Sequence, residues 1–91
     1  MSYDPKSHAF EIAGRTYVCI RGSDVDRDGM YLELSEISGA QTRIAMEIFY
    51  SDATGDMTVS LFDNAMPLPV VEWMIASAKE SLPPIKTDSK Q

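Results

Sequence analysis

Apolar and polar residues alternate along most of the chain as far as Leu61, and this period of two residues predicts β-strands. The predicted strands cover residues 8–13, 16–22, 30–35, 42–50 and 57–61. Gly14-Arg15 is expected to join the first two strands as a type II′ turn, which would pair Phe10 with Cys19. Turns containing Gly, Asp or Ser separate the other strands, so the pattern predicts an antiparallel β-meander.

The period changes after Asp63, where apolar residues begin to recur at the spacing of an α-helix. Pro69 suits the first turn of this helix, and Pro83-Pro84 cannot continue it. The apolar stripe of the helix consists of Val70, Val71, Met74, Ile75, Ala78 and Leu82. The predicted fold class is therefore α+β: an antiparallel β-meander of about five strands, with one C-terminal amphipathic helix packed on the sheet.

The chain has 91 residues, enough for one hydrophobic core, and predicts a single domain, 1–91. The core is expected over about 8–82, with tails at 1–7 and 85–91. The longest apolar run, 67–75, is interrupted by Glu72 and is far shorter than the roughly 20 residues that cross a bilayer. Because the N-terminus also lacks a secretory pattern and Cys19 is the single cysteine, we expect a cytoplasmic protein without membrane contacts.

The net charge of −6 arises from 14 acidic and 8 basic residues, and the basic residues are scattered along the chain. Nucleic-acid affinity depends mainly on clustered Lys and Arg that neutralise phosphates. The composition therefore disfavours nucleic acid as a partner and favours a basic protein.

Two acidic loops and one tryptophan are the predicted contacts with such a protein. The loops contribute Asp24, Asp26, Asp28, Asp52 and Asp56, whose charges would steer a basic surface. Trp73 falls outside the apolar stripe of the helix, so its side chain is expected to be partly exposed and to serve as an anchor. The alternative is that Trp73 packs against Met66, Leu68 or Pro83-Pro84 of its own chain.

The string from Asp24 to Gly29 has carboxylates at alternate positions followed by Gly, as in the first half of an EF-hand calcium loop. The position of the bidentate Glu that completes such a loop is occupied by Ser35. We therefore predict an acidic hairpin turn and no metal site, with calcium binding as the alternative.

No catalytic constellation emerges from the sequence. In the predicted hairpin register, His8 lies opposite Arg21 rather than Cys19, so the single His and the single Cys do not form a nucleophilic pair. Cys19 is expected to be a small buried apolar residue. Phosphate-binding loops, zinc-ligand spacings, catalytic triads and dinucleotide motifs are all absent from the sequence, which predicts neither an enzyme nor a cofactor.

The sequence leaves open how the sheet face away from the helix is covered. Depending on register, it would carry the apolar residues Val18, Ile20, Tyr31, Phe49 and Phe62. Such a face is covered either by curling of the sheet or by a homodimer, and we expect a homodimer.

The order of strands and helix loosely resembles the whirly and positive-cofactor type of single-stranded DNA-binding domains. The similar segments are Phe10-Glu11-Ile12, residues 17–21 and the Trp in the last helix. This resemblance implies a nucleic-acid-binding dimer as the alternative function. That function requires four arginines, Arg15, Arg21, Arg27 and Arg43, to converge on one face beside Tyr17, Tyr31 or Phe49.

The preferred hypothesis is a small acidic, non-catalytic interaction domain that docks on a larger basic protein. Inhibitors, immunity proteins, anti-CRISPR proteins and adaptors are similar in type, because they too are short, acidic single domains without catalytic motifs.

Overall fold

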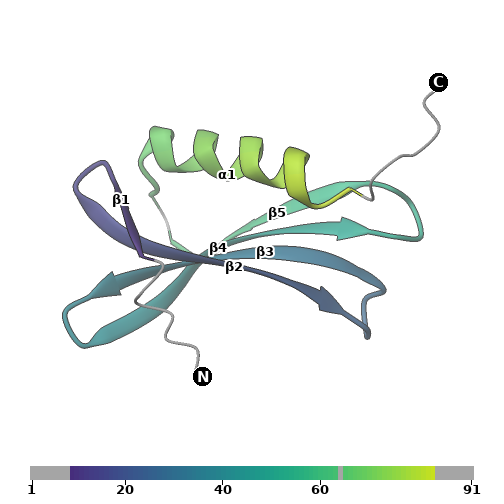
Figure 1. Cartoon of the computed structure of the whole chain (residues 1–91), viewed down its shortest axis with the longest axis horizontal. Helices are drawn as coiled ribbons and strands as arrows, with labels where there is room; N and C mark the ends of the chain where they lie inside the picture. Colours follow the sequence, from purple (N-terminus) through teal and green to yellow (C-terminus); the bar gives the residue numbers. More distant parts are fainter. Residues whose placement is uncertain (1–8, 64, 84–91) are drawn as a thin grey trace.

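The computed structural model describes residues 9–63 and 65–83, so His8 and the predicted tails at 1–7 and 85–91 lie outside the described residues. The elements are β1 (Phe10–Ile12), β2 (Arg15–Asp24), β3 (Gly29–Ser38), β4 (Gln41–Ser51), β5 (Met57–Leu61) and α1 (Leu68–Ser81). The strands form one twisted antiparallel sheet in the order β1-β2-β3-β4-β5, and α1 lies across one face of it (Figure 1). The predicted α+β meander with a C-terminal helix is confirmed.

The first hairpin turns one residue earlier than the sequence pattern predicts. Ala13 and Gly14 both have positive φ, 55° and 76°, as a type I′ turn requires at its two central residues. Phe10 therefore pairs with Tyr17 rather than with Cys19. The predicted type II′ turn at Gly14-Arg15 is wrong, and the register that placed His8 opposite Arg21 is wrong with it.

The hydrophobic core lies between the sheet and α1. Its buried members are Tyr17, Leu32, Leu34, Met46 and Ile48 from the strands and Val70, Met74, Ala78 and Leu82 from the C-terminal part of the chain. The strand residues occupy alternate positions, so they share the face that α1 covers. Removing these side chains from water is the main favourable contribution to folding.

The buried row on α1 is narrower than the predicted stripe. Val70, Met74, Ala78 and Leu82 follow one another at intervals of four and are almost fully buried, whereas Ile75 is 38% exposed. The helix ends at Ser81, two residues before Pro83. The described chain contains no helix long and apolar enough to cross a membrane.

The opposite face of the sheet carries apolar residues, as expected, and the chain covers part of it. Val18 is buried there, and Ile20 is half-buried. Gly22 leaves room for the ring of Tyr31, since a Cβ on Gly22 would lie 2.6 Å from the Tyr31 hydroxyl oxygen. Gly29 leaves room in the same way for the ring of Phe49. These two glycines let the aromatic rings lie close against the backbone of the sheet.

Candidate functional site

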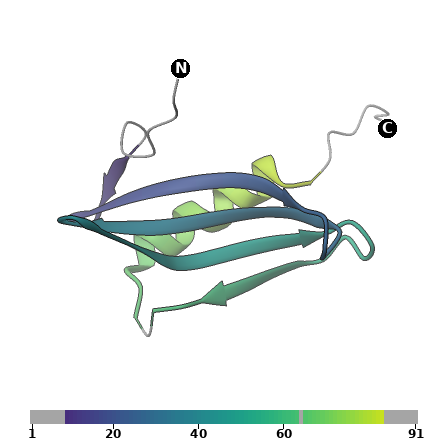
Figure 2. The same cartoon turned by 90° about the horizontal axis from the view of Figure 1, so that it is seen from below.

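The two acidic turns predicted as partner contacts adjoin in the folded protein. The backbone N–H of Asp52, in the β4–β5 turn, donates a hydrogen bond to the carbonyl oxygen of Asp28, in the β2–β3 turn, at 2.9 Å. Both turns lie side by side at the end of the sheet toward which α1 runs (Figures 1 and 2). We call this surface, formed by Asp26, Asp28, Asp52 and Asp56, the acidic end.

The β2–β3 turn is held by its own first carboxylate. Asp24 Oδ1 accepts hydrogen bonds from the backbone N–H groups of Asp26 and Arg27, at 3.1 and 3.2 Å. This is the local side-chain-to-backbone bonding by which Asp favours turns over regular structure. Asp28 completes the turn with a positive φ of 56°, a conformation that Asp tolerates better than most residues.

Arg27 neutralises part of the charge in this turn and covers the open face of the sheet. Its guanidinium pairs with Asp24 and makes two hydrogen bonds to Glu47, at 2.8 and 3.2 Å. It also lies 4.2 Å above the ring of Phe49, within the range of a cation–π contact. Hydrogen bonding from the Arg27 side chain is the main reason that the pKa of Asp24 is lowered.

The acidic end therefore consists of four of the five predicted carboxylates. Asp26, Asp28, Asp52 and Asp56 are exposed, and no ion pair to any of them occurs among the described residues. Asp24 is half-buried and paired with Arg27, so its charge is largely compensated. Clustered exposed carboxylates produce a negative potential that attracts basic groups at low ionic strength.

Internal hydrogen bonds shape the β4–β5 turn. Ser51 N–H donates to the Asp56 carbonyl at 3.0 Å, and Gly55 N–H donates to the Ser51 carbonyl at 2.8 Å. Gly55 has a φ of 78°, which favours Gly at this position. Side chains also bond the turn, since Asp56 N–H donates to Thr54 Oγ1 at 3.1 Å. The acidic side chains of this turn are thus carried on an ordered backbone.

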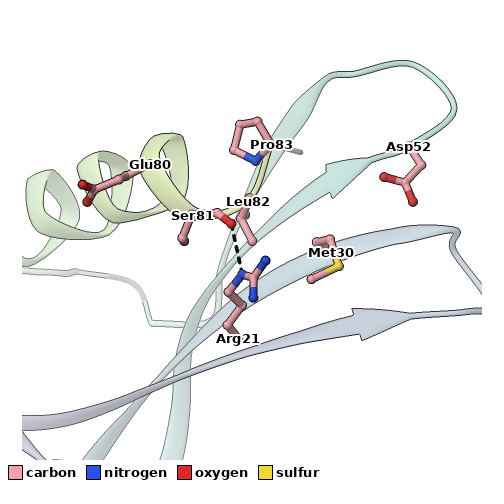
Figure 3. A pocket seen from close by; sticks show the side chains of 7 residues that line it. All are labelled: Arg21, Met30, Asp52, Glu80, Ser81, Leu82 and Pro83. Atoms are coloured by element: carbon pink, nitrogen blue, oxygen red, sulfur yellow. Dashed lines mark hydrogen bonds between the residues drawn. The ribbon is translucent and has the colours of Figure 1, made fainter. Parts of the chain in front are cut away.

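A pocket of about 530 Å³ opens beside the acidic end (Figure 3). Its lining residues are Arg21, Met30, Asp52, Glu80, Ser81, Leu82 and Pro83. Arg21 Nε donates a hydrogen bond to the carbonyl oxygen of Ser81 at 3.0 Å, which connects β2 to the last turn of α1. Figure 3 shows the carboxylates of Asp52 and Glu80 on opposite sides of this contact. The sequence pattern did not reveal the pocket, because its walls come from segments that are far apart along the chain.

Trp73 belongs to a different part of the molecule. Its side chain is half-buried, and the centroid of its ring lies 4.6 Å from that of the Phe10 ring in β1, at an interplanar angle of 38°. Trp73 thus packs against Phe10 of its own chain, a contact that the helical spacing did not predict. Neither Phe10 nor Trp73 lines the pocket beside the acidic end.

The four arginines required by the nucleic-acid alternative point to different places. Arg15 and Arg43 both pair with Glu36, and Arg43 also pairs with Asp63. Arg21 contacts the end of α1, while Arg27 covers the opposite sheet face. In the part of the chain that the structure describes, these side chains do not form a common basic surface.

Cys19 has the environment of a structural thiol. It is half-buried, and its Sγ lies 3.9 Å from the Met74 sulfur. Burial, and to a lesser degree the charge of Glu33, raises the pKa of Cys19 to about 11. A thiol with such a pKa is almost entirely protonated at neutral pH and is a poor nucleophile.

Residues 9–63 and 65–83 contain no group of three or more His, Cys, Asp or Glu side chains arranged to hold a metal ion. The predicted calcium alternative would use Asp24 as its first ligand, but Arg27 already engages both oxygens of that carboxylate. Comparisons of the chain with protein-family models, with curated proteins and with solved structures found no match.

Proposed function

We propose that the protein is a small non-catalytic interaction domain that uses the acidic end to dock on a basic surface of a larger protein. The observation that carries the proposal is the hydrogen bond between Asp52 and Asp28, which unites two separate acidic turns in one surface. Inhibitors, immunity proteins, anti-CRISPR proteins and adaptors of the cytoplasm are the classes of protein that this mode of action fits.

The pocket beside the acidic end supplies a complementary feature for a basic side chain. Met30, Leu82 and Pro83 offer apolar contact to the aliphatic part of a Lys or Arg, while Asp52 can pair with its charged group. Charge on the exposed turns would mainly increase the association rate, and insertion into the pocket would slow dissociation. Trp73 stays a separate predicted contact, because its ring rests against Phe10 rather than beside the acidic end.

Capture of the partner from a lysate of the native cells, treated with nuclease, tests this function. The neutralised variant combines Asp26→Asn with Asp52→Asn, one change in each turn. The matched control is Glu11→Lys, which alters the net charge by the same amount at an exposed site in β1. We expect one protein to be recovered with the wild type and the control, and recovery with the neutralised variant to fall about tenfold at low salt.

Two results would contradict the proposal. Recovery that is equal for the neutralised variant and the wild type would show that the acidic end is not the docking surface. Recovery that disappears after nuclease treatment would show that nucleic acid is the ligand, in agreement with the whirly-like alternative.

A further inference from the structure

β5 forms one edge of the sheet, and no further described strand pairs with it (Figure 2). Phe62 N–H donates to the carbonyl of Ala45 in β4 at 2.9 Å, and backbone groups point alternately to the two sides of a strand. The N–H and C=O groups of Met57, Val59 and Leu61 therefore point away from β4, toward the open edge. Such a row of backbone groups is a template for pairing with another strand.

Exposed apolar side chains gather along this same edge. Among the seven large apolar residues that are exposed in the described part of the chain, Val59 and Leu61 belong to β5, and Ile75 borders β5 from α1. A groove of about 210 Å³ runs between β5 and α1, and its lining includes Met57, Val59, Ile75 and Lys79. β5 itself has no Lys or Pro, the residues that commonly protect an edge strand from pairing.

The β5 sequence is self-complementary for antiparallel pairing. Met57, Val59 and Leu61 alternate with Thr58 and Ser60, so the pattern of apolar and polar residues reads the same in both directions. With Val59 opposite Val59 of a second copy, Met57 faces Leu61 of that copy and Thr58 faces Ser60. In this register the outward N–H and C=O groups of Met57, Val59 and Leu61 all find partners.

Two exposed charges of α1, Glu72 and Lys79, are of opposite sign and lie on either side of the same centre. Leu68, Glu72, Ile75 and Lys79 share one side of the helix by their spacing of three and four residues. Ile75 and Val59 both line the groove, so the centre of this row lies beside the centre of β5. In an antiparallel arrangement of two copies, Glu72 of one helix lies toward the end of the other helix that carries Lys79. Each chain has a net charge of −6, but the edge along which two copies would meet has no charged residue in β5 and has charges of both signs in α1.

We infer that a second copy of this chain pairs with β5, forming a two-fold symmetric homodimer with a continuous antiparallel sheet and the two α1 helices on the same face. The sequence predicted a homodimer through the sheet face opposite α1, whereas the geometry points to the β5 edge. The dimer does not depend on the acidic end, so each of the two proposals can fail without the other.

Sedimentation velocity of the purified wild-type chain over a range of concentrations, compared with two lysine variants, tests the dimer. Val59→Lys places like charges opposite each other at the two-fold axis and should weaken dimerisation at least about tenfold. Val25→Lys is the matched control, because Val25 is 93% exposed in the β2–β3 turn and β4 separates β2 and β3 from the β5 edge. A wild type that stays monomeric at about 100 μM would overturn the inference, as would a dimer that Val59→Lys leaves unchanged.

Hydrogen exchange of the wild type provides a second test that does not depend on the folding of a variant. The amide of Val59 should exchange at least about tenfold more slowly at a concentration where the dimer forms than at one where the monomer predominates. Amides in the β2–β3 turn should exchange equally at both concentrations. A Val59 amide whose exchange does not depend on concentration would also overturn the inference.

Discussion

At the scale of single residues, Gly29 has the clearest structural requirement. A Cβ at this position would meet the carbonyl oxygen of Tyr50, and it would lie 2.6 Å from the ring of Phe49. A Cβ on Gly22 would instead meet the far end of the Tyr31 side chain, which can move. We expect Gly29→Ala to lower the free energy of unfolding by about 2 kcal/mol or more, and Gly22→Ala to lower it by about 1 kcal/mol or less.

Urea unfolding monitored by circular dichroism would measure both changes. The comparison requires that the dependence of the free energy on urea stays the same in the two variants, so that the midpoints report stability. Equal midpoints for Gly29→Ala and Gly22→Ala would mean that the backbone at Gly29 relaxes around the added methyl group. The sequence pattern did not indicate these close approaches, because Gly22 ends the predicted strand 16–22 and Gly29 falls in the predicted turn before residue 30.

The raised pKa of the Cys19 thiol leads to a second prediction at the residue scale. Because its pKa is raised from 9.0 to about 11, the thiolate fraction at pH 8 is about 100-fold lower than in the unfolded chain. The reaction rate with a disulfide reagent should rise roughly tenfold for each pH unit and level off only near pH 11. In denaturant, the rate should level off near pH 9. Native kinetics that level off near pH 9 would show that Cys19 is more accessible to water than the structure indicates.

At the scale of elements, the first hairpin shows where sequence interpretation reached its limit. The single Gly14 is compatible with a type II′ turn as its first central residue and with a type I′ turn as its second. The structure has the second arrangement, in which Phe10 lies opposite Tyr17 and its ring also contacts Trp73. The type I′ turn is thus accompanied by a contact between Phe10 and a helix about 60 residues further along the chain. The local sequence pattern could not distinguish this turn from a type II′ turn.

The same turn supplies a prediction, because Ala13 adopts a positive φ that L-residues other than Asn and Asp disfavour. Ala13→Asn should raise the free energy of unfolding by about 0.5–1 kcal/mol, since Asn-Gly is a preferred pair for type I′ turns. Ala40→Asn is the control: Ala40 follows Gly39 in the β3–β4 turn and does not have a positive φ. Thermal unfolding would measure both, and an equal gain in the two variants would contradict the turn-specific explanation.

The helix illustrates a related limit. Helical periodicity correctly predicted α1 and its buried residues Val70, Met74 and Ala78. It also placed Ile75 inside, although Ile75 is 38% exposed beside β5. A broad apolar stripe leaves the rotation of a helix undetermined, and here the shape of the sheet determines which part of the stripe is buried. This rotation brings Trp73 closer to the sheet than the stripe predicted.

At the scale of the whole molecule, the order of the strands and the fold class could be predicted because consecutive strands with short turns pair with their neighbours. Turn signals in the sequence also predicted that Asp26, Asp28, Asp52 and Asp56 lie in the loops between strands. Their union in one surface was not predictable, because it depends on a hydrogen bond between Asp28 and Asp52, two residues in different turns. The pocket beside them likewise requires α1 to end close to β2, which no local pattern encodes.

The concentration of negative charge at one end should be visible in the salt dependence of stability. Like charges held close together in the folded state repel one another, and salt screens this repulsion. Raising NaCl from 20 to 200 mM should therefore increase the melting temperature of the wild type. Asp52→Asn should reduce this increase by roughly 1–2 °C, because Asp52 lies beside Asp28 in the acidic end. Glu11→Gln removes the same charge far from the acidic end and should preserve the increase. Scanning calorimetry of the three proteins at one protein concentration would decide. If Glu11→Gln and Asp52→Asn reduced the salt dependence equally, only net charge would matter, and the proximity of the two turns would have no electrostatic cost.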